Sequence, residues 1–159
     1  MDRIGREGRR AERFLVCLSG LSEVCDGGAI SELEHALQTA TRAERARADD
    51  ELVLAALCHD IGKVFGDAGH GDIAADLLTP HVRTEVASAV RHHGAFTARH
   101  WNPSLRGESD PRLRFRNEPW FCLAEQFVDD WDMKSFDPVF PREDLAHFEP
   151  LVRRLVTGA

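Results

Sequence analysis

The chain has 159 residues, 43% of them hydrophobic, and this length and composition suit a single domain with a substantial buried core. Lys and Arg number 20 against 27 Asp and Glu, and the resulting net charge of −7 argues against nucleic acid as the main partner. No apolar stretch approaches the ~20 residues that span a bilayer, and acidic residues near the start are wrong for a secretory signal, so we expect a cytoplasmic protein with no membrane partner.

The first part of the chain contains three helical patterns. Apolar residues recur at helical spacing over about residues 3–23, and the glycines of "CDGGAI" end this helix. Ser31 and Glu34 have the spacing of a capping box, which predicts a helix to about residue 46. The next helix, from Asp49 or Asp50 to Leu57, is apolar almost all round, so we expect it to be central and buried.

The second part is also predicted to be helical. The glycine-rich "GDAGHGD" forms a loop that presents His70 before a short helix over residues 73–78. Further helices are predicted over about residues 83–93, 119–131 and 150–156, with a long loop after "HHGAF". Because no alternating pattern is long enough to require a sheet, the expected fold class is all-α, one compact helical domain over residues 1–159.

The four cysteines, Cys17, Cys25, Cys58 and Cys122, are scattered along the chain and form no C-x-x-C pair. No export signal accompanies them, so free thiols are the better prediction than two disulfides.

The segment "LVLAALCHDIGK" raises a chemical problem, because its apolar run ends in His59 and Asp60. A buried imidazole and carboxylate are costly unless a strong partner compensates them. Histidine and aspartate are ligands that iron, manganese and zinc accept, and a carboxylate such as Asp60 can bridge two ions. Six side chains are therefore candidate ligands of one metal centre: His35, His59, Asp60, His70, His93 and Asp132.

Two of these assignments have competitors in the sequence. His92 competes with His93, and neighbours on one helix point about 100° apart, so only one can face the site. In "VDDWD", Asp129 and Asp130 compete with Asp132, and Asp129 is an alternative candidate for a hydrogen-bond acceptor of a ligand histidine.

The order of the motifs "EHALQTATRAER", "AALCHDIGK", "GHGDIAADLL", "VRHHGAF" and "WDMKSFDP" resembles the HD-domain superfamily, a group of helical metal-dependent proteins. The resemblance covers about residues 31–156, preceded by an N-terminal helix and loop over residues 1–28. Members with a single metal need only the equivalents of His35, His59, Asp60 and Asp132. The two additional histidines are typical of dinuclear members.

Among dinuclear members, the pattern is similar to the mixed-valent diiron oxygenases, which include myo-inositol oxygenase and enzymes that cleave the carbon-phosphorus bond of hydroxyphosphonates. "VRHHGAF" resembles their R-x-H segment and selects His93 over His92, and "WD" resembles their closing motif and selects Asp132. The resemblance implies one iron held by His35, His59, Asp60 and Asp132. It implies a second iron held by His70, His93 and the shared Asp60.

The activity that this resemblance implies is oxidation, by O2 at an Fe2+/Fe3+ pair, of a small hydroxylated, anionic, organophosphonate-like substrate at its hydroxyl-bearing carbon. Lys63 resembles the lysine of "HD-x-G-K" in inositol oxygenase, which implies a catalytic and substrate-binding role beside Asp60. A plain surface lysine is the alternative. Gln38, one turn after His35, and Arg91 are further candidates for substrate binding.

The chain also departs from the phosphonate-cleaving members, because Cys25 and Gly28 stand where they carry a tyrosine and a glutamate, and no tyrosine occurs at all. The ending "SFDPVF" and "HFEPLVRRLV" is similar to uncharacterised bacterial HD-domain proteins commonly labelled phosphohydrolases. A phosphohydrolase for a nucleotide or phosphate monoester, using manganese, zinc or another divalent metal, is therefore the alternative function. A domain that binds a ligand without turnover is a third hypothesis, and the sequence does not identify the substrate or the oligomeric state.

Overall fold

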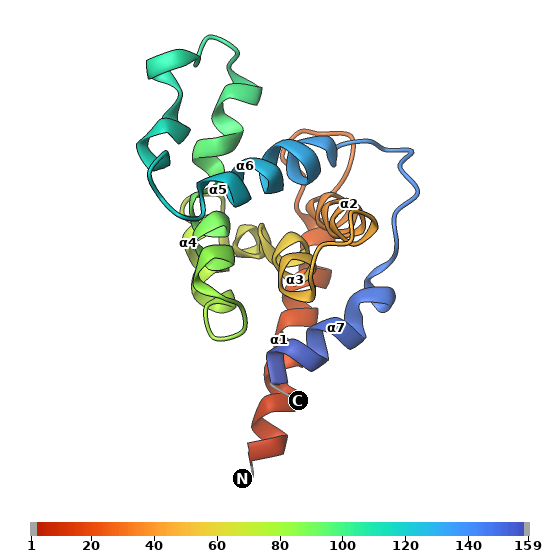
Figure 1. Ribbon diagram of the computed structural model, residues 1–159. Helices are drawn as coiled ribbons and strands as arrows, with labels where there is room; N and C mark the ends of the chain where they lie inside the picture. The colour runs from red at the N-terminus through yellow and green to blue at the C-terminus, as the bar shows by residue number, and fades with distance from the viewer. Residues whose placement is uncertain (1–2, 158–159) are drawn as a thin grey trace.

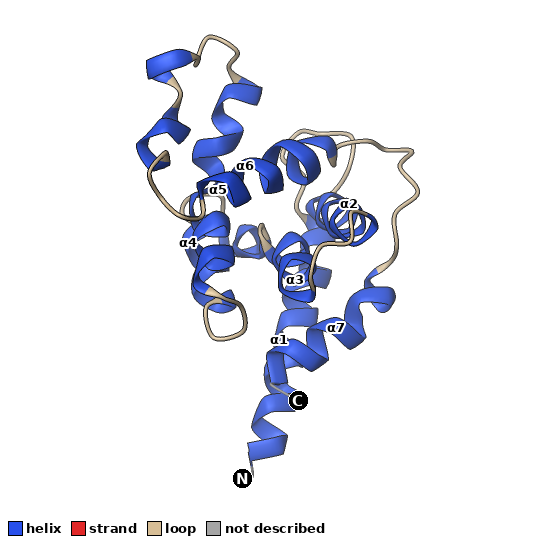
Figure 2. Cartoon of the chain, in the orientation of Figure 1, coloured by secondary structure: helices blue, strands red, loops and turns tan. Residues whose placement is uncertain are grey.

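The computed structural model describes residues 3–157, so the four terminal residues of the expected 1–159 domain lie outside it (Figures 1 and 2). Helices and loops account for all of this range, and the absence of strands within it confirms the predicted all-α class. The main helices are α1 (Arg3–Gly20), α2 (Glu32–Arg45), α3 (Asp50–Cys58), α4 (His70–Leu78), α5 (Thr84–Trp101), α6 (Phe121–Gln126) and α7 (Leu145–Thr157). Between residues 3 and 157 no helix combines the length and hydropathy needed to cross a bilayer.

Helices α2 and α3 begin where the sequence predicts, because side chains cap their free N–H groups. Ser31 Oγ accepts a hydrogen bond from the Glu34 N–H at 3.2 Å, and the Glu34 carboxylate accepts one from the Ser31 N–H at 2.9 Å. Asp49 Oδ1 accepts a hydrogen bond from the Leu52 N–H at 3.1 Å. The capping box and the Asp49 cap therefore fix the starts of the two helices that carry His35 and lead into His59.

Helix α3 lies at the centre of the molecule and contacts α2, α4, α5 and α7 (Figure 1). Every side chain from Leu52 to Cys58 is buried, as expected for a helix that is apolar on all faces. Helices α1 and α7, from opposite ends of the chain, pack side by side beneath it. The core of the domain therefore surrounds α3 and carries the residues after it, His59 and Asp60, into the interior.

Four helices differ from their predicted bounds. Helix α4 begins at His70 rather than at Ile73, so His70 lies in its first turn and not in the preceding loop. Helix α5 continues past His93 to Trp101, because Gly94 does not interrupt it. Helix α7 begins at Leu145 rather than Pro150, since Asp144 Oδ1 accepts a hydrogen bond from the His147 N–H at 2.9 Å and starts the helix earlier.

The expected helix over residues 119–131 is split. Helix α6 ends at Gln126, and a π-helical turn, Phe127–Trp131, and a 3-10 turn, Asp132–Lys134, follow it. The hydrogen bonds of a π turn span one residue more than those of an α-helix, which changes the direction of the side chains after it. Asp132, directly after this turn, is buried.

Candidate metal centre

The six candidate ligands converge from three helices and two turns. His59 and Asp60 follow α3, His35 lies on α2, His70 begins α4, His93 lies on α5, and Asp132 follows the π turn. Five of these side chains are buried, and His70 is partly buried. Residues that are nearly 100 positions apart in the chain therefore meet in one place inside the bundle.

Asp60 lies between two pairs of histidines. Its Oδ2 lies 3.3 Å from His59 Nε2 and 3.6 Å from His35 Nε2. Its Oδ1 lies 3.2 Å from His70 Nε2 and 3.3 Å from His93 Nε2. Each oxygen of this carboxylate thus faces its own pair of imidazoles.

Asp132 completes the first of these two groups. Its Oδ1 lies 3.1 Å from His35 Nε2 and 3.6 Å from His59 Nε2. The first group therefore contains two imidazole nitrogens and oxygens from two carboxylates. The second contains two imidazole nitrogens and the other oxygen of Asp60.

Main-chain carbonyls fix the tautomer of all four histidine rings. The Nδ1 atoms of His35, His59, His70 and His93 lie 2.6 to 2.9 Å from the carbonyl oxygens of Ser135, Ala56, Asp67 and Val90, respectively. A carbonyl oxygen only accepts, so each Nδ1 carries the hydrogen, and in a neutral ring Nε2 presents a lone pair. A metal-ligating histidine usually has this arrangement, in which the nitrogen remote from the ion donates to a carbonyl or carboxylate.

The facing Nε2 atoms and carboxylates require positive charge between them. His35 Nε2 lies 3.1 Å from His59 Nε2, and His70 Nε2 lies 3.3 Å from His93 Nε2. Asp60 Oδ1 and Asp132 Oδ2 are buried without any hydrogen-bond donor. Burial lowers the pKa of His59, but the charges of Asp60 and Asp132 outweigh it and raise this pKa well above its ordinary value. The residues therefore fit divalent metal ions, which supply that charge and accept the Nε2 lone pairs.

The competitors of two ligands point elsewhere. The ring of His92 packs against Phe115 and Trp120, with centroid distances of 4.5 and 5.2 Å. Asp129 pairs with Arg112 rather than with a ligand histidine, so the expectation that it accepts a hydrogen bond from such a histidine is wrong. Asp130 is exposed and pairs with Lys134.

Gly62, in the "HDIGK" motif, permits the close approach that places His70. A Cβ at this position would lie 2.5 Å from the carbonyl oxygen of His70 and 2.8 Å from its Cα. Any larger residue would push the start of α4 away from the turn that follows Asp60. The glycine of the motif therefore acts on the geometry of the second histidine pair.

Lys63 lies beside the ligands, where its Nζ is 3.2 Å from Asp60 Oδ2. The same nitrogen lies 3.1 Å from Glu32 and 3.1 Å from Asp26, two residues that no motif in the sequence marks as part of the site. Burial and then the charge of Asp60 raise the pKa of Glu32 to about 7, although Lys63 opposes the shift. Burial lowers the pKa of Lys63, but Asp60 and Glu32 raise it more, so Lys63 stays a cation and is not a free surface lysine.

A cavity of about 240 Å³ opens beside the ligands and is lined by Lys63, His35, Asp60, His70, His93, Asp132, Asp26, Asp67, Gly94, Thr97, Trp101, Met133 and Phe136. The ring of Phe136 stacks on that of His35 at a centroid distance of 4.3 Å. An adjoining cavity of about 420 Å³ shares Lys63, His35 and Phe136 and reaches Gly28. The space next to the ligands therefore has polar and aromatic walls and the volume of a small molecule.

Two predicted substrate residues do not line this cavity. Arg91 pairs with Asp72 at 3.0 Å and with Asp76 at 2.5 Å, because both lie on the neighbouring helix α4. The Gln38 amide donates to the carbonyl oxygen of Asp137 at 2.8 Å and accepts from the N–H of the same residue. The structure thus gives Arg91 and Gln38 partners that hold the fold together, and the prediction that they bind substrate is not supported by their positions.

The cysteines have no disulfide partners, as the sequence predicts. Cys58 is buried in α3, and burial raises the pKa of its thiol. Cys25 is exposed, so it does not occupy the interior of the cavity.

A comparison with protein families matches residues 33–135 to the HD domain. The chain belongs to the HD-domain family. The match begins just before His35 and ends just after Asp132, so it includes all six residues of the centre. A comparison with curated proteins finds no match. An HD domain is typically a metal-dependent enzyme, and the buried histidines and aspartates of this HD domain fit that role.

Proposed function

We propose that this HD domain is a dinuclear metalloenzyme. The observation that carries the proposal is the position of Asp60, whose two oxygens face two different histidine pairs. In this proposal one ion is held by His35, His59, Asp60 and Asp132. The second ion is held by Asp60 and the pair His70 and His93.

The second ion has only three protein ligand atoms, so coordination positions remain for a substrate or for O2. His70 and His93 both line the cavity, which gives a small molecule access to these positions. Nitrogen and oxygen ligands without sulfur suit iron, manganese and zinc alike. The identity of the ions therefore has to be measured.

We further propose that the chemistry is that of a diiron oxygenase acting on a small hydroxylated, anionic substrate. The sequence likeness to diiron oxygenases and the complete set of six ligands support this function. When bound, two irons would lower the pKa of the substrate hydroxyl and exchange electrons with O2. Lys63 would bind an anionic substituent of the substrate, since its ammonium lines the cavity and is fixed by carboxylates.

A second candidate, a metal-dependent phosphohydrolase, is favoured by membership of the HD-domain family. The two ions would then activate water and bind the phosphoryl oxygens. A cavity of about 240 Å³ with Lys63 as its only lysine or arginine favours a small phosphate monoester over a nucleotide with several phosphates.

The first experiment is to measure metal identity and content in protein produced with iron and purified without O2, followed by EPR after partial oxidation. Two irons per chain with a coupled half-integer-spin signal, and O2 uptake with hydroxylated acids, would support the oxygenase. Two redox-silent ions with phosphate release from monoesters would support the hydrolase instead. One ion per chain would refute the dinuclear site.

A matched pair of variants tests the second ion directly. His93→Ala should reduce the metal content from two ions to one, because it removes a ligand of the second ion. His92→Ala, on the adjacent residue whose ring packs against Phe115 and Trp120, should leave the metal content unchanged. The assignment is wrong if the two variants bind equal amounts of metal.

A further inference from the structure

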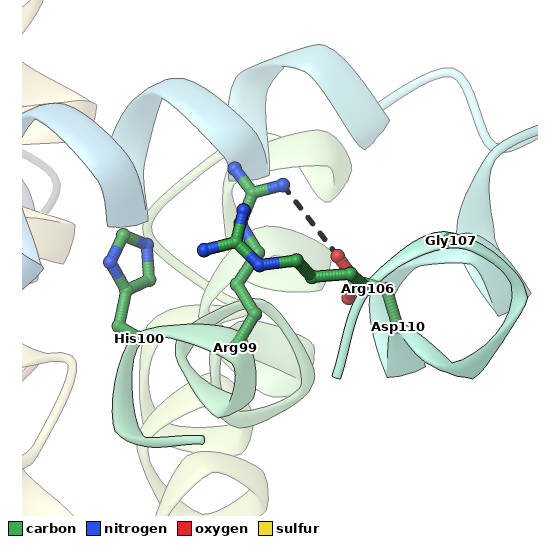
Figure 3. Close-up of a pocket in the computed structure, with 5 residues that line it drawn as sticks. All are labelled: Arg99, His100, Arg106, Gly107 and Asp110. Atoms are coloured by element: carbon green, nitrogen blue, oxygen red, sulfur yellow. Dashed lines mark ion pairs between the residues drawn. The ribbon is translucent and has the colours of Figure 1, made fainter. Parts of the chain in front are cut away.

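A second cavity, of about 520 Å³, lies at the end of α5 and shares no lining residue with the cavity at the metal centre. It is lined by Arg99, His100, Arg106, Gly107 and Asp110 (Figure 3). The lining carries two arginines against one aspartate, although the whole chain has a net charge of −7. The cavity is therefore a local concentration of positive charge on an acidic protein.

The backbone directs Arg106 into this cavity. Gly107 has a φ of 56°, which allows a sharp turn directly after Arg106. Arg106 Nε donates a hydrogen bond to the carbonyl oxygen of Pro103 at 2.8 Å, which orients the guanidinium. Figure 3 shows the side chain extending from this turn toward Arg99.

The terminal nitrogens of Arg106 have no protein acceptor. Among residues 3–157, neither of these nitrogens forms a hydrogen bond or an ion pair with a carboxylate, whereas the terminal nitrogens of the neighbouring Arg99 and Arg112 do. A guanidinium provides five donors in a planar fork, and here only Nε is used. Arg106 is therefore oriented by the protein and left with free donors at the cavity.

Arg99 contributes a second guanidinium whose charge is only partly balanced. Its Nη1 lies 3.6 Å from Asp110 Oδ2, the ion pair drawn in Figure 3, and its Nη2 lies 2.9 Å from Asp129 Oδ2. Both carboxylates are shared with Arg112, which lies 3.6 Å from Asp110 and 3.0 Å from Asp129. Two guanidinium groups that line one cavity repel each other, and a bound anion would relieve this repulsion.

We propose that this cavity is an anion site for a phosphate group, free or as a monoester, distinct from the metal centre. A phosphate has three or more acceptor oxygens, enough to accept hydrogen bonds both from the free nitrogens of Arg106 and from Arg99 Nη1, which lies near Asp110 without a hydrogen bond to it. A single carboxylate has only two oxygens, which suffice to accept hydrogen bonds from one guanidinium group. The His100 ring, whose Nε2 lies 2.6 Å from Asp129 Oδ1, forms another wall of the site.

The test is a calorimetric titration of metal-loaded protein with inorganic phosphate, at an ionic strength held constant with chloride. Arg106→Gln removes the free donors, and Arg114→Gln is the matched control. Arg114 Nε also donates to a carbonyl oxygen three residues earlier, that of Pro111, at 3.2 Å, but Arg114 does not line the cavity. Both arginines are exposed, and thermal unfolding verifies that both variants fold.

We expect Arg106→Gln to weaken phosphate binding by about tenfold or more and Arg114→Gln to change it by less than about twofold. Equal losses in both variants would mean nonspecific charge attraction and would overturn the proposal. Binding that is unaffected by Arg106→Gln, as expected for phosphate on the metal ions, would overturn it too, as would no binding at millimolar phosphate. Repeating the titration with methyl phosphate and a nucleoside monophosphate distinguishes a free phosphate from an ester, because an ester whose organic part contacts the cavity binds more tightly.

Discussion

His70 Nε2 and His93 Nε2 lie 3.3 Å apart, and each ring already donates its Nδ1 hydrogen to a main-chain carbonyl. When both rings are neutral, this orientation presents their lone pairs to each other. The neutral pair is therefore unfavourable until a cation binds between the rings and Asp60, and the folded state should bind metal much more tightly than the unfolded chain.

Metal removal should consequently destabilise the fold. Ions present at about a thousandfold above their dissociation constant add about 4 kcal/mol of unfolding free energy per site. Thermal unfolding before and after chelation should show a marked fall in the transition temperature, reversed when metal is added back. An unchanged transition in protein whose metal content has been shown to fall would contradict the assigned site.

Gly62→Ala should destabilise the protein by about 1–3 kcal/mol, because the new Cβ would overlap the backbone of His70. It should also weaken metal binding, since His70 would have to move. Gly94→Ala is the control: this glycine is helical, and a Cβ there meets nothing within 4 Å, so alanine should stabilise α5 by about 0.5–1 kcal/mol. Urea unfolding measures the stability of both variants, and metal analysis measures their metal content. Similar stabilities would contradict the close approach of Gly62 to His70.

Arg112→Met should cost about 3 kcal/mol of unfolding free energy. The Arg112 side chain is 1% exposed, pairs with Asp129 and donates to the carbonyl oxygen of Phe96 at 2.7 Å, so its loss removes a buried donor from both acceptors. Arg91→Met removes an ion pair with carboxylates on exposed residues and should cost at most about 1 kcal/mol. Denaturant unfolding measures both, and equal costs would argue against a structural role for the buried guanidinium.

Glu32 should make the stability of the metal-free protein depend on pH. Its pKa rises from an ordinary value of 4.5 to about 7, first through burial and then through the charge of Asp60. The folded state thus binds the Glu32 proton more tightly than the unfolded state does. The stabilisation of the fold by this proton is fully present below pH 4.5 and is lost as the pH rises to about 7. Glu32→Gln should reduce the decline in stability between about pH 5 and pH 8, and an equally steep decline in the variant would refute the raised pKa.

The helical class and most of the candidate metal ligands can be predicted from the sequence because they have local signals. The capping box of Ser31 and Glu34 marked the start of α2, and the all-apolar run marked α3 as buried. The choice of His93 over His92 needs the family likeness, since the apolar periodicity of α5 does not decide which of the two histidines faces the site. The structure places the ring of His93, not that of His92, against Asp60.

The features that could not be predicted from the sequence depend on tertiary contacts. Asp26 and Glu32 meet Lys63 only because the loop before α2 folds back over the turn after α3. Arg91 was a reasonable anion-binding candidate by type, but its direction is set by Asp72 and Asp76 on a different helix. The π turn before Asp132 has no composition that distinguishes it from an α-helix.

The position of Asp132 has a topological consequence. His35 and the segment after Asp132 are joined through the hydrogen bond from His35 Nδ1 to the Ser135 carbonyl, across 100 residues of chain. An ion held by His35 and Asp132 would cross-link the two ends of this long loop, and closing such a loop removes conformational entropy from the unfolded chain. The four cysteines of this domain are all unpaired, so a metal ion at this position would be the cross-link that a disulfide provides in many secreted proteins. Unlike a disulfide, the ion would exchange with the metal ions in the surrounding solution.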